Sequence, residues 1–147
     1  GDSGNAGKGG DIQLYLNENE EIAYDQSIIN TGDLIVDGGS ITGDSTGYAG
    51  NGGNISIYTD EPDESANGPV VFEISGNLSA NGGSTIEDNS DAGNGGQIYI
   101  ANYDNPTSSA ETFIIGYNEI NTSGGNGVYA GRAGSIDIEF EDYRFIK

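Results

Sequence analysis

The feature that most restricts the fold of this chain is an internal repeat of about 43 residues. Four segments begin with Ala-Gly, followed by one other residue and then by Gly-Gly or Ala-Gly. Each segment continues into a stretch in which apolar residues alternate with other residues. They start at Ala6, Ala49, Ala92 and Ala130, at offsets of 43, 43 and 38 residues. A second unit lies between them, starting at Ser27, Val70 and Thr112, and ends in the pairs Gly38-Gly39, Gly82-Gly83 and Gly124-Gly125. Two anchors that recur at nearly one period predict a stack of similar supersecondary units.

Both units carry the period-two alternation of β-strands. In the first unit, Ile12 and Leu14 alternate with Gln13 and Tyr15. The second unit is predicted to be two strands joined at a bend near Gly32, Gly76 and Gly116, which makes three strands per coil. One buried parallel ladder is expected from the first strands, made of Ile12, Leu14, Ile55, Ile57, Ile98, Ile100, Ile136 and Ile138.

This pattern predicts an all-β chain that folds as a parallel β-solenoid, with about three 43-residue coils plus a partial fourth. Residues 1–147 are expected to form this single domain, with residues 135–147 as its C-terminal strand and a docking tail. An alternative parse uses the triplets centred on Ile12, Leu34, Ile55 and their successors, which recur every ~21 residues, a length compatible with shorter solenoid coils. The flanking sequences of alternate triplets differ, which favours 43.

The phrases GNGGNISIY, ISGNLSANGGS and AGNGGQIYI resemble the Gly-rich repeats of secreted cell-surface proteins, of which the filamentous-haemagglutinin-like β-helices are an example. The resemblance extends over almost the whole chain and implies a right-handed β-helix exported to the cell surface. Proteins that build rings or sheaths from stacked β-arches are a looser comparison. An extracellular or cell-surface location is therefore expected, and the resemblance supplies no catalytic residue.

Composition narrows the function classes. The chain has 24 acidic and 4 basic residues, a formal net charge of -20, and neither His nor Cys. This charge opposes binding to nucleic acid and favours cations. Without His and Cys the usual nucleophile–base arrangements are missing, so we expect no enzyme. No stretch approaches the ~18 apolar residues of a membrane span, so membrane insertion is not expected.

Acidic residues concentrate in the loop that follows each first strand. Stacking would place these carboxylates on one edge of the solenoid, where their oxygens suit Ca²⁺. The alternative is a solvated charge run that keeps the protein soluble. The candidate calcium ligands, the only cofactor site expected, are Glu18, Glu20, Glu21, Asp60, Glu61, Asp63 and Glu64.

Polar residues also align from repeat to repeat, and these ladders support parallel stacking rather than a binding site. No Asp lies over another Asp within them, and amides and hydroxyls can hydrogen-bond along the stack. The aligned sets are Asp11, Asn54, Gln97 and Ser135; Asp33, Asn77 and Glu119; and Asp37, Asn81 and Ser123.

Outward-facing aromatic residues form a candidate interaction surface. Tyr15 and Tyr58 align, and Tyr99 lies diagonally beside them. Such a strip can stack on sugar rings or fill a protein interface, although tyrosine is also common on exposed strands. Tyr48 and Tyr129 form a second alignment beside the glycine-rich loops. The small residues of those loops permit close backbone approach and positive φ.

The sequence predicts a self-assembling subunit of an extracellular filament, sheath or matrix, joined to copies of itself through the solenoid edges. Open parallel edges invite another chain to add on. Tyr143, Phe145 and Ile146 in the tail are expected to dock on the next subunit, or alternatively to cover the chain's own last coil. The competing hypothesis is a cell-surface adhesin or carbohydrate-binding module whose partner is a polysaccharide.

Overall fold

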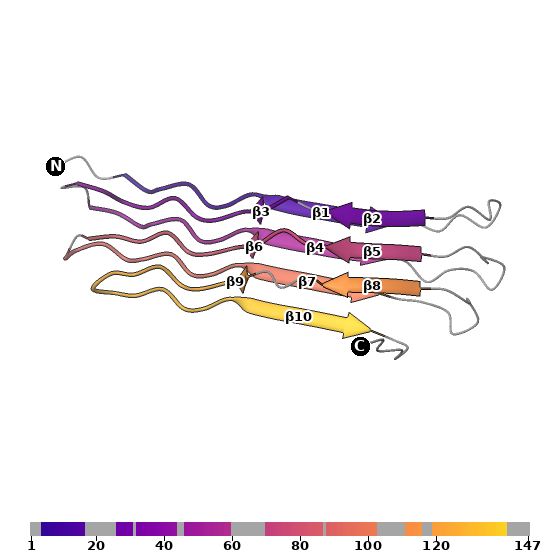
Figure 1. Ribbon diagram of the computed structural model, residues 1–147. Coiled ribbons are helices and arrows are strands. Elements are labelled where there is room, and N and C mark those ends of the chain that lie inside the picture. The colour runs from indigo at the N-terminus through magenta and orange to yellow at the C-terminus, as the bar shows by residue number, and fades with distance from the viewer. Residues whose placement is uncertain are drawn as a thin grey trace.

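All regular structure in the computed structural model, within the residues that it describes, is β-strand. Those residues are 4–16, 26–30, 32–43, 46–59, 70–86, 88–102, 111–115 and 119–140. Figure 1 shows the strands stacked from the N-terminus to the C-terminus. They are β1 (Asp11–Leu16), β2 (Gln26–Asn30), β3 (Leu34–Ile35), β4 (Asn54–Thr59), β5 (Val70–Ile74), β6 (Leu78–Ser79), β7 (Gln97–Asn102), β8 (Glu111–Ile115), β9 (Ile120–Asn121) and β10 (Ser135–Phe140).

The strands form three parallel sheets, and each sheet takes its strands from successive repeats. The orders are β1-β4-β7-β10, β2-β5-β8 and β3-β6-β9. We call each step of the stack a level: described residues up to 43 form level 1, those in 46–86 level 2, those in 88–128 level 3 and those in 129–140 level 4. Since in-register parallel strands lie about 4.8 Å apart, equivalent residues of neighbouring levels are in direct contact.

The register confirms the 43-residue repeat. Ile12 pairs with Ile55, Ile55 with Ile98, and Ile98 with Ile136. The ~21-residue parse is wrong, because Leu34 pairs with Leu78 in a different sheet from the Ile12 ladder. The bend that divides the second unit is present at Gly32 and Gly76, whereas Gly116 lies outside the described residues.

The core takes side chains from all three sheets, including Ile74 of β5 in the second sheet. Ile55, Ile57, Ile98 and Ile100 are fully buried and pack in one cluster with Leu78 and Ala80. Ile12 and Leu14, on level 1, are only partly buried. The expected burial of the ladder is wrong at level 4, where Ile136 is 46% and Ile138 40% exposed. The reason is that, among the described residues, level 4 contributes a strand only to the first sheet, so nothing opposes the inner face of β10.

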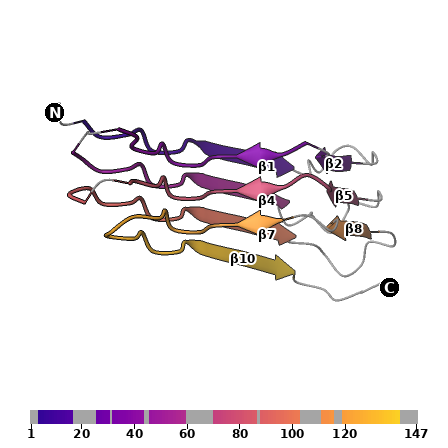
Figure 2. The ribbon, with the colours of Figure 1, turned by 60° about the vertical axis from the view of Figure 1, so that its left-hand side comes forward.

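Long glycine-rich arms extend from the strands and carry the chain from each level to the next, as Figures 1 and 2 show. Their glycines allow backbones to touch. A Cβ placed on Gly53, Gly96 or Gly134 would lie 1.7 Å from the carbonyl oxygen of the equivalent glycine one level below. The expected positive φ occurs at Gly43 alone among the described residues. Close approach, rather than left-handed backbone, is therefore what these arms require of glycine.

The two ends of the stack differ. Figure 2 shows β1 of level 1 and β10 of level 4 at opposite ends of the stack. Level 1 contributes a strand to each of the three sheets, and level 4 to one. No helix in the described part of the chain is long and apolar enough to cross a membrane.

Candidate functional site

The predicted calcium ligands and the predicted tail contacts fall outside the described residues. This holds for Glu18, Glu20, Glu21, Asp60, Glu61, Asp63 and Glu64, and for Tyr143, Phe145 and Ile146. Within the ranges that the structure does describe, no group of three or more acidic side chains is placed to hold a metal ion. Both sets of residues therefore stay predictions.

The outward tyrosines form the strip that their spacing indicates. Tyr15 pairs with Tyr58 in register, with ring centroids 4.8 Å apart and ring planes tilted by 41°. Tyr99 pairs with Ser56 and lies diagonally to Tyr58, at 6.5 Å and 54°. Cross-strand aromatic contacts of this kind stabilise a sheet. They also direct part of each ring face toward another ring, which leaves less of it for a ligand.

Polar contacts tie the strip to its surroundings. The Gln13 side-chain amide donates to the Tyr58 hydroxyl, and the Tyr99 hydroxyl donates to Glu139 Oε2 at 3.1 Å. Tyr15 remains 42% exposed. The strip is thus a partly self-packed surface whose most accessible ring belongs to level 1.

The ladders that begin at Asp33 and Asp37 are confirmed at every step and have a consistent direction. The ladder that begins at Asp11 has this contact only at its first step, because Gln97 and Ser135 donate their N–H groups to glycine carbonyls. In the confirmed contacts, a side-chain oxygen on one level accepts the backbone N–H of the equivalent residue on the next. Asp33 Oδ1 accepts from Asn77 at 2.8 Å, and Asn77 Oδ1 accepts from Glu119 at 3.1 Å. The same contact joins Asp11 to Asn54, Asp37 to Asn81, Asn81 to Ser123, Ser40 to Ser84, Ser84 to Asn126, Asn51 to Asn94 and Asn94 to Arg132.

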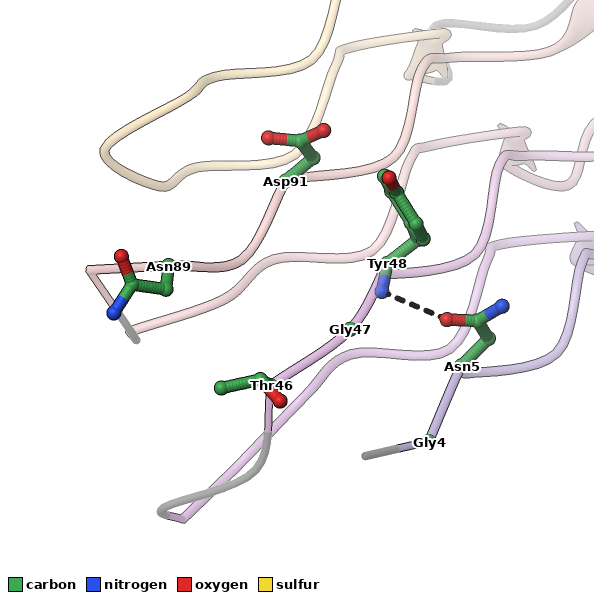
Figure 3. Close-up of a pocket in the computed structure, with 7 residues that line it drawn as sticks. All are labelled: Gly4, Asn5, Thr46, Gly47, Tyr48, Asn89 and Asp91. Atoms are coloured by element: carbon green, nitrogen blue, oxygen red, sulfur yellow. Dashed lines mark hydrogen bonds between the residues drawn. The ribbon is translucent and has the colours of Figure 1, made fainter. Parts of the chain in front are cut away.

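A polar hollow of about 490 Å³ lies in the glycine-rich arms, and sequence reasoning did not find it. Figure 3 shows its lining, which comes from three consecutive levels. Level 1 supplies Gly4 and Asn5, level 2 supplies Thr46, Gly47 and Tyr48, and level 3 supplies Asn89 and Asp91.

Hydrogen bonds fix the middle of this lining from both sides. The Tyr48 N–H donates to Asn5 Oδ1 at 3.1 Å, and the Gly47 N–H donates to Ser90 Oγ at 3.2 Å. Ser90 is 1% exposed, so the second bond anchors the segment to the interior of the arm. A Cβ on Gly47 would lie 2.1 Å from the Gly4 carbonyl oxygen, which shows how closely these two segments approach.

Tyr48, Asp91 and Tyr129 form a short ladder beside the hollow, with Tyr48 bridged to Asp91 and Asp91 to Tyr129. Tyr48 is 62% and Tyr129 61% exposed. The alignment of Tyr48 and Tyr129 is visible in the sequence. Asp91 also precedes Ala-Gly, at the same repeat position as Tyr48 and Tyr129. This shared position in the sequence indicates a surface that mixes aromatic and acidic side chains.

Comparison with known proteins gives no relative. The chain matches no family model, no curated protein and no solved structure at a level of similarity that separates relatives from chance.

Proposed function

We propose that this protein is a structural, non-catalytic subunit that assembles with copies of itself into an extracellular filament, sheath or matrix. In this proposal the levels wind as a right-handed β-solenoid of three 43-residue coils and a partial fourth, and subunits join end to end through its edges. The parallel order of all three sheets, with strands taken from successive repeats, supports a winding of this kind.

The observation that carries the proposal is the outer face of level 1. Inside the molecule, Gly50 and Gly53 stack so tightly that a Cβ would lie 1.9 and 1.7 Å from the oxygens of Gly7 and Gly10. Gly7 and Gly10 occupy the same repeat positions on level 1, yet a Cβ on either would meet nothing within 4 Å. Level 1 therefore offers an incoming level the same close-approach surface that levels 2 to 4 already use.

The other end of the stack offers a complementary surface. The Ser135 N–H donates to Gly96 of level 3. Because successive residues of a strand direct their backbone groups to opposite sides, the N–H and C=O of Ile136 and Ile138 point to the outer edge of β10. Their side chains are 46% and 40% exposed, and burial under a further level would stabilise the contact by about 1–2 kcal/mol each.

Joining two unlike ends is a heterologous contact, and such contacts produce rings or open filaments. An open parallel edge is also the feature through which β-proteins most readily add chains. Both ends are built from one repeat, so a second copy of this chain is the partner whose register and side chains match.

The experiment compares the wild-type protein with the double variant Gly7→Ala/Gly10→Ala by negative-stain electron microscopy and sedimentation velocity. The wild type is expected to form filaments or sheets. The double variant is expected to stay monomeric with an unchanged or slightly raised melting temperature, because its methyl groups enter open space in the monomer but block the next level. Ile86→Ala serves as the control, since Ile86 is 77% exposed on level 2, away from both ends.

Two results would overturn the proposal. One is a wild-type protein that remains monomeric at millimolar concentration. The other is a double variant that assembles with the same geometry as the wild type.

The competing function, a carbohydrate-binding module, is supported by the exposed ring of Tyr15 beside the polar side chain of Gln13. It predicts that a wild-type monomer binds polysaccharide and that Tyr15→Ala abolishes the binding. Because the tyrosine rings of the strip pack on one another, the carbohydrate-binding module is the weaker of the two proposed functions.

A further inference from the structure

The hollow in the glycine-rich arms combines the groups that recognise a sugar. One exposed aromatic ring, Tyr48, stands beside the Asp91 carboxylate, and Figure 3 shows both side chains extending in the same direction from neighbouring levels. Asn5 and Asn89 add side-chain amides, and Thr46 adds a hydroxyl. Amides and hydroxyls both donate and accept hydrogen bonds, as a polyhydroxylated ligand requires.

The two groups that would contact a ligand most directly are available. Within the described part of the chain, neither the Tyr48 hydroxyl nor the Asp91 carboxylate has a hydrogen-bond partner. The backbone N–H groups of Gly47 and Tyr48 already have hydrogen-bond partners, because they donate to Ser90 and Asn5. The surface is therefore held in place before a ligand arrives, which lowers the entropic cost of binding.

Size and charge restrict the ligand class. A hollow of about 490 Å³ lies within the ~300–1,000 Å³ range of small-molecule sites. None of the described residues that line it is basic, and the chain carries a net charge of -20, so phosphate, sulfate and uronate groups are repelled. What remains is a neutral or positively charged ligand with an apolar face for the ring and hydroxyls for the carboxylate.

We propose that this hollow binds one pyranose ring of a neutral or amino-substituted polysaccharide, with Tyr48 against the C–H face of the sugar and Asp91 accepting from its hydroxyl or ammonium groups. The site lies in the arms rather than on the end faces of levels 1 and 4, so it does not depend on the proposed self-assembly. It is also distinct from the strip of Tyr15, Tyr58 and Tyr99, which lies on the outer face of the first sheet.

The test titrates ¹⁵N-labelled protein with three β-1,4-linked hexasaccharides that differ in one substituent: those of glucose, glucosamine and glucuronate. To keep the protein monomeric, every titration uses the Gly7→Ala/Gly10→Ala background or a concentration below assembly. The glucose and glucosamine hexamers are expected to bind and to shift the backbone amide signals of Gly47, Tyr48 and Asp91. The glucuronate hexamer is expected to leave them unchanged.

Two variants examine the assigned contacts. Asp91→Asn is expected to weaken binding by about 10-fold, or about 1.4 kcal/mol, because an amide oxygen accepts a weaker hydrogen bond than a carboxylate oxygen. Tyr48→Ala is expected to weaken it by roughly 5–10-fold through loss of the aromatic contact. Both side chains are exposed, so neither change should alter the melting temperature by more than about 2 °C.

The matched control is Tyr129→Ala. Tyr129 has nearly the same exposure as Tyr48 and belongs to the same ladder, yet it does not line the hollow. Tyr129→Ala and Tyr15→Ala should bind as the wild type does.

Three outcomes reject the proposal. The first is no binding of the glucose and glucosamine hexamers at millimolar concentration. The second is binding that survives both Asp91→Asn and Tyr48→Ala. The third is binding of the glucosamine hexamer alone that disappears with added salt and is indifferent to Tyr48, which would mean charge attraction without a sugar site.

Discussion

The glycine stack through the arms leads to a prediction in which one substitution has opposite effects at two equivalent positions. Gly10, Gly53, Gly96 and Gly134 occupy the same place on levels 1 to 4. A Cβ on Gly96 would lie 1.7 Å from the Gly53 oxygen, whereas one on Gly10 would meet nothing within 4 Å. Gly96→Ala should therefore destabilise the fold, and Gly10→Ala should not.

The magnitude follows from the contacts that must move. Real Cβ atoms essentially never lie within 3.0 Å of a heavy atom elsewhere in the chain, so alanine at position 96 must push the Gly53 carbonyl away. That carbonyl accepts from the Gln97 N–H at 3.1 Å, and the Gly96 N–H donates to the Ala80 oxygen at 2.7 Å. Losing or distorting two such bonds costs about 1–3 kcal/mol each when the groups stay buried. Alanine recovers about 0.4–1 kcal/mol by restricting the unfolded chain, which leaves a net loss of about 3 kcal/mol.

At Gly10 only the stabilising effect of alanine on the unfolded chain remains, because a Cβ there meets no other atom. Its φ lies outside the left-handed region, so alanine fits without strain and should stabilise the monomer by about 0.4–1 kcal/mol. Urea denaturation followed by circular dichroism, at a concentration below assembly, measures both variants. In thermal terms Gly96→Ala should melt roughly 10 °C lower, at about 3 °C per kcal/mol for a chain of this size. If Gly96→Ala is no less stable than Gly10→Ala, the glycine register and the tight stacking derived from it are wrong.

Three further predictions follow from the ladders, the acidic loops and the tail. Asn81→Ala should lower the free energy of unfolding by about 1–2 kcal/mol, because Asn81 Oδ1 accepts the Ser123 N–H at 2.8 Å. Asn126 is the last residue of its ladder, so Asn126→Ala should lower the free energy of unfolding by less than half as much. Equal losses in the two variants would contradict a stabilising ladder. Millimolar Ca²⁺ should raise the melting temperature or promote assembly by relieving repulsion among the acidic loops, and equal melting in Ca²⁺ and in chelator at matched ionic strength would remove a specific role for the ion. Deleting Tyr143 to Lys147 should abolish end-to-end assembly while the monomer stays folded, and filaments of unchanged geometry would exclude docking through the tail.

The sequence determined the repeat, the strand positions and the register. Alternation marks Ile12, Ile55 and Ile98 as inward-facing, and the shared period aligns them, because in-register parallel stacking is the arrangement that buries all of them together. The same reasoning placed Tyr15 next to Tyr58 and Asp33 next to Asn77 on neighbouring levels, and the structure agrees in each case. The matching pattern within each strand on successive repeats leaves these pairings almost no freedom.

The tertiary structure decided what the ends and the arms of the stack look like. Ile136 carries the same local pattern as Ile98, yet one is 46% exposed and the other fully buried, because burial depends on whether another strand lies opposite. Likewise Gly10 and Gly96 have equivalent sequence contexts, and only the presence of a level beneath separates open space from a 1.7 Å contact. The hollow around Tyr48 and Asp91 draws on three levels, so its volume depends on how far the arms separate, a distance that no single repeat encodes.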